Sequence, residues 1–122
     1  MKKYSEDHQW VEVAEDGTAK VGITQFAAEE LGEITFVELP SVGKSFQSGE
    51  QLCVVESVKA ASDVYAPAGG TVIAVNSPLE EDPSGLNEDP EGTAWLCQIK
   101  DWDAAALDKL MDAAAYEKYC RG

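Results

Sequence analysis

The chain has 122 residues, 44% of them hydrophobic and 26% charged, and nine Lys and Arg against 23 Asp and Glu give a net charge of −14. We expect one domain over residues 1–122 with a single core. The charge opposes binding to nucleic acid or an anionic membrane, and no apolar run approaches the ~18 residues of a membrane span. The pair Lys2-Lys3 has no apolar segment behind it, so we expect no signal peptide and a cytoplasmic protein.

The first elements are predicted to be a hairpin and a short helix. Residues 10–13 alternate apolar and polar, residues 15–18 supply a turn, and residues 19–23 resume the strand pattern. Thr24 is suited to cap a helix over residues 25–31, which Gly32 would end. Such a helix has only about two turns, so packing against the rest of the chain must stabilise it.

Short strands dominate the remainder of the chain. Pro40 cannot donate to a strand ladder and marks an edge or a strand end, while Gly43, Gly49 and Gly69-Gly70 mark bends or turns. Short strands with such frequent turn signals predict a mainly β fold, a small sandwich or flattened barrel. The expected strands are residues 33–39, 51–57, 62–66, 71–75 and 93–100.

A loop and a C-terminal helix complete the prediction. Residues 78–92 are rich in Pro, Gly and carboxylates, which predicts a surface excursion with at most a helical turn around residues 79–81. Asp103, or Asp101 before it, would cap one helix that runs to about Tyr119. Its apolar face, expected to pack on the core, comprises Leu107, Leu110, Met111 and Ala114.

The side chains do not indicate catalysis or metal binding. His8 is the only histidine, and no Cys–His or Ser–His pair has a recognisable spacing. Cys53, Cys97 and Cys120 form no CxxC, and their odd number argues against a disulfide framework. We expect Cys53 and Cys97 to be small buried hydrophobes. Zinc ligand sets, calcium-loop spacing and a glycine-rich phosphate loop are not found, so no metal site is expected.

Lys59 lies between two predicted strands and is therefore expected at the tip of a hairpin. It is the only basic residue between Lys44 and Lys100, so its amine would stand alone on an acidic surface. A solvated charge is the simplest interpretation. A protruding lysine with Val58 and Ala60 beside it would also suit an enzyme that modifies the amine.

The motif around this lysine is one of a series of motifs spread along the chain. The central motif comprises Glu56, Ser57, Val58, Lys59, Ala60, Ala61, Ser62 and Asp63, and the others include His8-Gln9-Trp10-Val11, Gly22-Ile23-Thr24, Phe36-Val37-Glu38-Leu39-Pro40 and Asn87-Glu88-Asp89-Pro90. Together they resemble the H-protein family of the glycine cleavage system, in which lipoic acid acylates the lysine amine. The resemblance covers almost the whole chain.

The resemblance implies a fold and a function. The fold would be a lipoyl/biotinyl-type flattened β-barrel, or sandwich hybrid, with a short internal helix and a C-terminal helix, and with Gly43 and Gly70 as turn glycines. Lys59 would carry lipoate, and the chain would be a non-catalytic carrier of aminomethyl groups and electrons. The implied partners are glycine decarboxylase (P protein), aminomethyltransferase (T protein), dihydrolipoyl dehydrogenase (L protein), and a lipoate ligase or lipoyl/octanoyl transferase.

A pocket for the loaded arm is also implied. In the family it is lined near the start of the chain and just after the lysine, which indicates His8, Gln9 and Asp63; a half-buried structural role is the alternative for His8. The family usually has Glu where Gln9 stands, so a carboxylate that could hold a cationic aminomethyl group is missing. Glu56 and Asp63 would either be recognised by the ligase or be solvated.

Other functions stay open beside this one. Biotin carriers usually have methionine on both sides of the lysine, where this chain has Val58 and Ala60. An H-like lipoyl relay that passes lipoate to 2-oxoacid dehydrogenase complexes would have the same motif, and exchange with a decarboxylase would distinguish it. A non-lipoylated adaptor that uses only its acidic surface would keep Lys59 as a free amine.

Overall fold

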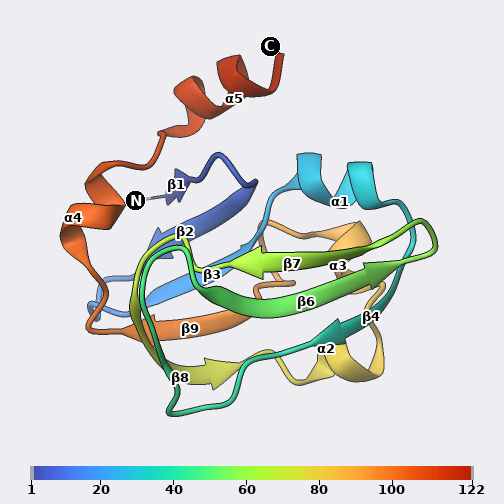
Figure 1. Cartoon of the computed structure of the whole chain (residues 1–122), viewed down its shortest axis with the longest axis horizontal. Coiled ribbons are helices and arrows are strands. Elements are labelled where there is room, and N and C mark those ends of the chain that lie inside the picture. The colour runs from blue at the N-terminus through green and yellow to red at the C-terminus, as the bar shows by residue number, and fades with distance from the viewer. Residues whose placement is uncertain (1, 122) are drawn as a thin grey trace.

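The computed structural model describes residues 2–121, which form two antiparallel sheets packed face to face (Figure 1). The strands are β1 (Lys2–Tyr4), β2 (Gln9–Val13), β3 (Ala19–Ile23), β4 (Ile34–Glu38), β5 (Ser45–Phe46), β6 (Gln51–Ser57), β7 (Ala61–Tyr65), β8 (Gly70–Val75) and β9 (Cys97–Lys100). The helices are α1 (Gln25–Leu31), α2 (Pro78–Glu81), α3 (Gly85–Glu88), α4 (Ala104–Asp108) and α5 (Ala113–Arg121). The fold is the mainly β sandwich or flattened barrel that the sequence predicts.

The strand order explains how distant segments form one core. The six-stranded sheet has the order β1-β2-β3-β9-β8-β5, and the three-stranded sheet has the order β4-β6-β7. Alternating apolar residues of both sheets point inward, so Val37, Val55 and Val64 of the smaller sheet are buried. Val21 and Val72 fill the same role in the larger sheet. The buried faces hold the smaller sheet in register.

Several predicted elements are confirmed and two strands are additional. The first hairpin, the helix Gln25–Leu31 and the strands on both sides of Lys59 lie within one residue of their predicted bounds. Thr24 caps α1 as predicted, since its hydroxyl accepts a hydrogen bond from Ala27 N at 3.2 Å. The short strands β1 and β5 lack a clear alternating pattern and were not expected. Cys53 and Cys97 are buried as predicted, and burial raises the pKa of Cys97 to about 12.

The excursion over residues 78–92 contains more structure than predicted. It forms two short helices, α2 and α3, each of which contributes one buried leucine to the core, Leu79 and Leu86. The predicted strand over residues 93–100 was wrong in its first half, because the ladder begins only at Cys97. Ala94 N instead donates to Asp89 O at 3.1 Å, which keeps this part of the chain in a turn.

The prediction of one C-terminal helix was also wrong. The helix stops at Asp108, and Met111 forms an isolated antiparallel bridge with Tyr4 in which each N–H donates to the other residue's carbonyl at 2.8 Å. A second helix, α5, then begins after Asp112, whose carboxylate accepts from Ala115 N at 2.8 Å. The predicted apolar face is therefore divided: Leu107 is buried, but Ala114 is exposed.

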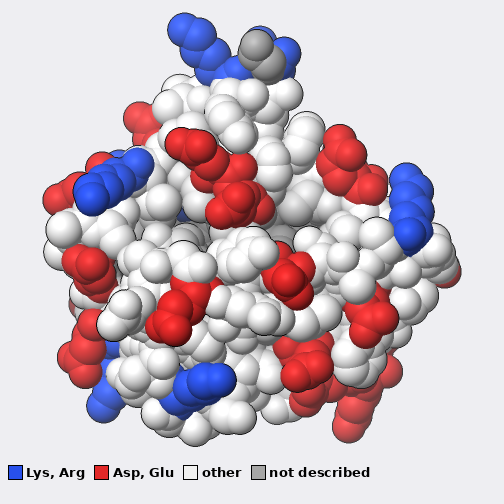
Figure 2. Space-filling model, in the orientation of Figure 1, with Lys and Arg blue, Asp and Glu red and all other residues white. Residues whose placement is uncertain are grey.

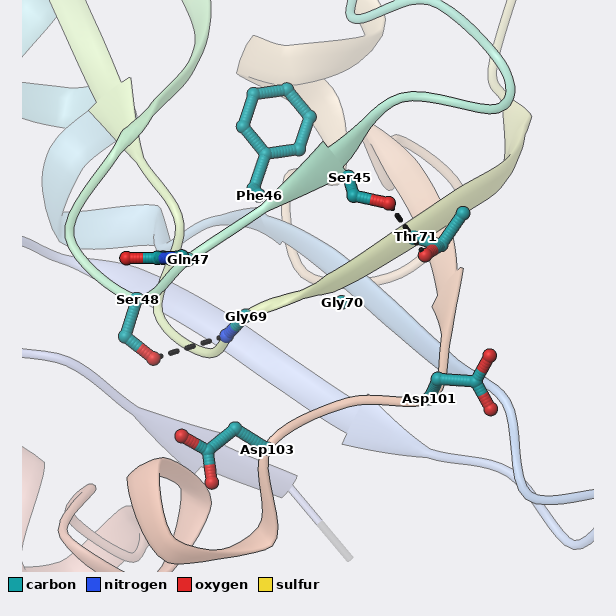
Figure 3. Close-up of a pocket in the computed structure, with 9 residues that line it drawn as sticks. All are labelled: Ser45, Phe46, Gln47, Ser48, Gly69, Gly70, Thr71, Asp101 and Asp103. Carbon is teal, nitrogen blue, oxygen red and sulfur yellow. Dashed lines mark hydrogen bonds between the residues drawn. The ribbon is translucent and has the colours of Figure 1, made fainter.

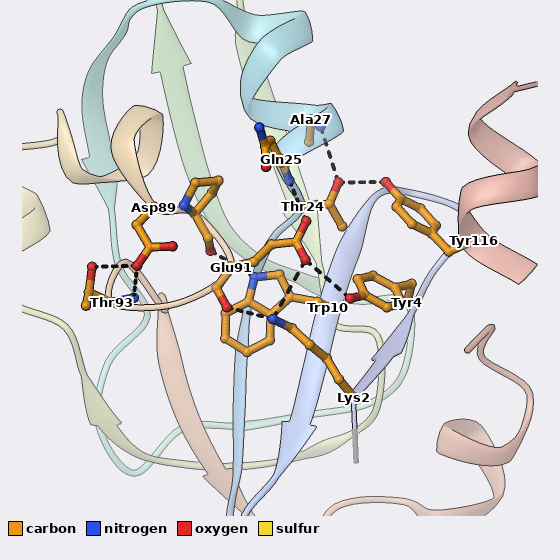
Figure 4. A network of polar contacts seen from close by, with 11 residues as sticks. Lys2, Tyr4, Trp10, Thr24, Gln25, Ala27, Asp89, Glu91, Thr93 and Tyr116 are labelled. Carbon is orange, nitrogen blue, oxygen red and sulfur yellow. Dashed lines mark hydrogen bonds and ion pairs between the residues drawn. The ribbon is translucent and has the colours of Figure 1, made fainter. Parts of the chain in front are cut away.

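An indole and a carboxylate fix the start of the chain (Figure 4). Trp10 is buried and its Nε1 donates to Pro90 O at 2.9 Å. Glu91 accepts hydrogen bonds from the Tyr4 hydroxyl at 3.3 Å and from Gln25 N, the first residue of α1, at 2.8 Å, and pairs with Lys2 at 3.7 Å. Burial, with the nearby Glu91 carboxylate, raises the pKa of Tyr4 to about 12. Glu91 thus connects β1 to the N-terminus of α1.

None of the helices described is long and apolar enough to cross a membrane.

Candidate functional site

The candidate site is the turn that joins β6 to β7 and places Lys59 at its tip. Ser57 N donates to Ala60 O at 2.8 Å, so Val58 and Lys59 are the two central residues of the turn. The Ser57 hydroxyl lies 3.2 Å from both Lys59 N and Ala60 N and accepts from them. The side chain of Ser57 therefore closes the turn a second time, and the predicted hairpin tip is confirmed.

The turn is also attached to the neighbouring strand. Val58 N donates to Glu33 O at 3.0 Å, immediately before β4 begins. Val58 has 64% of its surface exposed, and Lys59 and Ala60 are exposed as well. The result is a backbone held from two sides that presents an accessible amine between side chains of modest size. This geometry suits a lysine that another protein must reach.

The Lys59 stem lies over Gly32, which ends α1. A Cβ added to Gly32 would lie 3.4 Å from Lys59 Cε, and the Gly32 backbone has φ 76° and ψ −147°. Gly32 N donates to Ala28 O at 3.1 Å and closes the helix. The sequence predicted Gly32 only as a helix stop, because local spacing does not reveal its contact with the lysine stem.

Substitution of Gly32 by alanine is expected to lower the free energy of unfolding by about 1–3 kcal/mol, because this backbone region is essentially restricted to glycine. The added methyl group would also displace the Lys59 stem. Urea unfolding measures the first effect, and chemical shifts of Lys59 Cε measure the second. Gly17→Ala is the matched control, since Gly17 has φ 87° but nothing within 4 Å of an added Cβ. Equal shifts of Lys59 Cε in both variants would contradict the predicted contact.

The surface around the turn is acidic. Figure 2 shows carboxylates distributed over the face that carries β4, β6 and β7, with basic groups fewer and mostly toward the edges. Glu56 and Asp63 are exposed on this sheet. Among residues 2–121, the ion pairs join Lys2 to Glu91 and Glu117 to Arg121, and neither includes Lys59. The lysine amine is thus available in a carboxylate-rich environment.

His8, expected in an arm pocket, lies in an aromatic cluster. Its ring is half-buried, with centroid distances of 4.5 Å to Phe26, 5.6 Å to Tyr116 and 5.8 Å to Tyr119. His8 Nδ1 is 2.6 Å from the Tyr116 hydroxyl, which is also 2.6 Å from the Thr24 hydroxyl. His8 therefore connects α5 to the N-terminus of α1, which agrees with the structural alternative for this residue.

Protonation of His8 is expected to lower the free energy of unfolding as the pH falls. Burial lowers its pKa below the ordinary 6.5, and the carboxylates of Asp7 and Glu30 oppose this without cancelling it. As the pH falls, the imidazole of the unfolded chain therefore takes up a proton before that of the folded protein. The stability that the neutral His8 contributes is complete above pH 6.5 and is lost as the pH falls toward the pKa of the folded state. His8→Asn, which tolerates the positive φ of 66°, should show a smaller loss between about pH 7 and pH 5 in urea unfolding. Parallel pH profiles would contradict this.

Gln9 and Asp63 have separate partners. Gln9 is 3% exposed; its Oε1 accepts from the Ser5 hydroxyl at 2.8 Å and its Nε2 donates to Asp7 O at 3.1 Å. Asp63 is exposed on β7 and accepts from Gln51 Nε2 at 3.2 Å. The hydrogen bonds thus attach the three predicted pocket residues to different elements and do not bring them together.

Several pockets are found on the surface of residues 2–121, and residues 57–60 of the lysine turn line none of the following three. One of about 330 Å³ includes Gln9, residues 66–67 after β7, and the chain around Met111. A second, of about 420 Å³, adjoins the lysine turn through Glu33 and is bounded by residues 82–88. The third, about 510 Å³, is lined by Ser45, Phe46, Gln47, Ser48, Gly69, Gly70, Thr71, Asp101 and Asp103 (Figure 3). The lysine turn contributes nothing to this third pocket.

The two predicted turn glycines have different environments. Gly43 has φ 93° and donates to Val72 O at 2.7 Å, as suits a turn. Gly70 is the first residue of β8, and a Cβ added there would lie 2.9 Å from Lys100 O. Gly70 therefore lies just after the turn, and its lack of a side chain permits close approach of β9.

Comparison with known proteins gives a consistent result. A family described as "Glycine cleavage H-protein" matches residues 2–122. The glycine cleavage system H protein of Chromobacterium violaceum is 55% identical to this chain, over 95% of this chain and 91% of its own length. The protein of the same name from Dinoroseobacter shibae is 52% identical, over 93% of this chain and 92% of its own length. A crystal structure of a glycine cleavage system H protein from Mycobacterium marinum superposes with a TM-score of 0.89 at 36% identity, covering 99% of this chain and 97% of that one.

Proposed function

The chain belongs to the glycine cleavage H-protein family, and on this basis we propose that it is the lipoyl-bearing carrier of the glycine cleavage system, with lipoate attached to Lys59. The observation that carries the assignment of the residue is the exposed Lys59 at a turn fixed by Ser57 and by Glu33. The whole chain would act as one carrier domain.

The residues of the turn fit an acylated lysine. Attachment forms an amide bond between Lys59 Nζ and the lipoyl carbonyl carbon, while the bond from that carbon to its activating group breaks, the activating group leaves, and the ammonium group loses two protons to solvent. The amine must therefore enter the active site of another enzyme. The exposed Val58 and Ala60 leave the amine accessible, and the Ser57 hydroxyl fixes the turn backbone by accepting hydrogen bonds from Lys59 N and Ala60 N. Formation of the amide also removes the positive charge at the turn.

The bound group would supply a dithiolane ring: once its S–S bond has been reductively opened, one sulfur can carry a one-carbon amine, and reoxidation of the dithiol to the disulfide releases two electrons. The protein itself contributes a rigid base and an acidic surface. A fixed turn limits the volume that the end of the arm explores, which raises its effective concentration at a docked partner. The carboxylates around the turn favour partner enzymes with basic surfaces.

The partner set follows from this assignment. We propose that the chain works in the cytoplasm with the glycine decarboxylase, the aminomethyltransferase and the dihydrolipoyl dehydrogenase, and that it is loaded by a lipoate ligase or a lipoyl/octanoyl transferase. It would have no catalytic activity of its own. The burial of Cys53 and Cys97, whose thiol pKa values are raised by desolvation, is consistent with an inert scaffold.

Intact mass followed by peptide mapping tests the proposal, on protein produced with lipoate and an active ligase. We expect one lipoyl-sized increase confined to Lys59. The purified holo-protein should then support exchange between bicarbonate and the glycine carboxyl carbon when glycine decarboxylase is added. An unmodified Lys59 would overturn the carrier assignment and favour the acidic adaptor.

One observation bears on the relay alternative. The side chain of Gln9 is uncharged, buried and bonded within the protein to Ser5 and Asp7, so it offers no carboxylate for a cationic group. A lipoylated protein that fails the exchange assay but transfers lipoate to a 2-oxoacid dehydrogenase complex would be a relay. Exchange at a rate typical of a carrier would exclude that role as the principal one.

A further inference from the structure

Asn87 holds the backbone on which the lysine turn rests. Its Nδ2 donates to Gly32 O at 2.7 Å, and its Oδ1 accepts from Ile34 N at 2.9 Å. These two backbone groups lie on either side of Glu33, whose carbonyl accepts from Val58 N in the lysine turn at 3.0 Å. The amide of one side chain therefore brackets the residue to which the turn is attached.

The position of Asn87 is itself fixed by the core. The preceding residue, Leu86, is fully buried in the same apolar cluster as Ile34. The short helix α3 that carries both residues is in contact with α1. Asn87 is exposed, so its side chain is not required to fill the interior. The buried Leu86 thus fixes the backbone position of Asn87, and the Asn87 side chain in turn holds the segment Gly32–Ile34.

Both attachments of Lys59 converge on this segment. The lysine stem lies over Gly32, where an added Cβ would be 3.4 Å from Lys59 Cε, and the turn backbone is bonded to Glu33. Without the amide of Asn87, Gly32 O and Ile34 N would lose this partner. The segment could then shift, and the turn and the lysine stem would move with it.

We propose that Asn87 is a positioning residue for Lys59, which acts through Gly32, Glu33 and Ile34 to hold the lysine turn in the conformation that the acylating enzyme binds. The inference rests on the proposed acylation of Lys59. An ordered turn reduces the conformational entropy that the enzyme must remove on binding, and small displacements of a reacting group reduce rates strongly. The segment over residues 78–92 therefore has a function beyond its two buried leucines.

The test is the steady-state acylation of full-length apo-protein by a lipoate ligase with lipoate and ATP. Asn87→Ala should lower kcat/KM for the apo-protein by roughly 10-fold. The matched control is Asn76→Ala, because Asn76 Nδ2 also ties the backbone of this part of the chain, donating to Thr93 O at 2.9 Å, but not at the lysine turn. The control should remain within about 2-fold of the unmodified sequence.

A second measurement reports on the turn directly. In Asn87→Ala the Val58 amide should exchange with solvent roughly 5- to 30-fold faster, while the Ser57 amide, bonded inside the turn to Ala60 O, should change little. A purely structural role would accelerate exchange at both amides and throughout the sheet. Asn87→Asp, which keeps the acceptor for Ile34 N but places an oxygen against Gly32 O, should reproduce the loss of kcat/KM without shortening the side chain.

The outcomes separate this inference from the proposed function. If the unmodified sequence is not acylated at Lys59, the proposed function fails. If it is acylated and Asn87→Ala or Asn87→Asp matches Asn76→Ala in kcat/KM, with Val58 exchange unchanged, the positioning role is overturned. Should Asn87→Ala fold too poorly for kinetics, Asn87→Asp alone decides between the two results.

Discussion

Lys59→Arg is expected to abolish lipoylation and aminomethyl transfer while the fold remains intact. The guanidinium stays protonated and cannot serve as the nucleophile that an acyl-transfer enzyme requires. Because the side chain is exposed at the turn, the free energy of unfolding should change by no more than about 0.5 kcal/mol. Intact mass after incubation with ligase and a glycine exchange assay measure function, and urea unfolding measures stability.

Lys44→Arg is the control for this experiment. Lys44 is exposed and its Nζ lies 5.2 Å from the centroid of the Phe46 ring, so arginine preserves both its charge and its contact with the aromatic face. This variant should be acylated and active like the unmodified sequence. Aminomethyl transfer by Lys59→Arg at an undiminished rate would refute Lys59 as the attachment residue.

The largest loss of stability is expected for Trp10→Ala, at about 3–5 kcal/mol. Trp10 is 1% exposed and packs with Tyr4 and Tyr116, and its ring lies against Gly22, where an added Cβ would be only 2.7 Å from the indole. The substitution leaves a cavity and removes the donor to Pro90 O. Urea unfolding should show a lower midpoint with little change in slope.

Trp102→Ala is the control that separates the contribution of burial to stability from that of the indole hydrogen bond. The Nε1 of Trp102 also donates to a backbone carbonyl at 2.9 Å, that of Gly17, but the side chain is only half-buried. This variant should lose roughly 1–2 kcal/mol. If the two tryptophan variants were equally destabilised, the cavity left by the Trp10 side chain could not be the dominant cause.

The lysine turn could be predicted because its determinants are local. Two β-rich segments, residues 51–57 and 62–66, leave only a short connection between them, and Ser57, the first residue of the observed turn, is a residue type that commonly bonds turn backbone. The same holds for Thr24 and Gly32 at the ends of α1. The contact between Lys59 and Gly32 could not be predicted in the same way, because it depends on how α1 packs against the sheets.

The C-terminal region shows why other features could not be predicted. Leu107, Leu110 and Met111 have the spacing of one continuous helix, and only the pairing of Met111 with Tyr4 interrupts it. That pairing joins residues distant in sequence, which a local pattern cannot reveal. Asn87 is similar: its bonds to Gly32 and Ile34 connect α3 to a segment more than fifty residues earlier. The four-residue helices themselves are too short for a periodic signal.

The bridge between Tyr4 and Met111 has a consequence for the order of folding. It closes nearly the whole chain into a loop, and the entropy of closure grows with loop length, so this contact should form late and open early. Opening it would release α5 and the aromatic ring of Tyr116 from His8 and Thr24. The lysine turn is bonded within itself and to Glu33, and it shares no hydrogen bond with the Tyr4–Met111 bridge. A molecule in which only this bridge has opened would therefore keep the lysine turn formed.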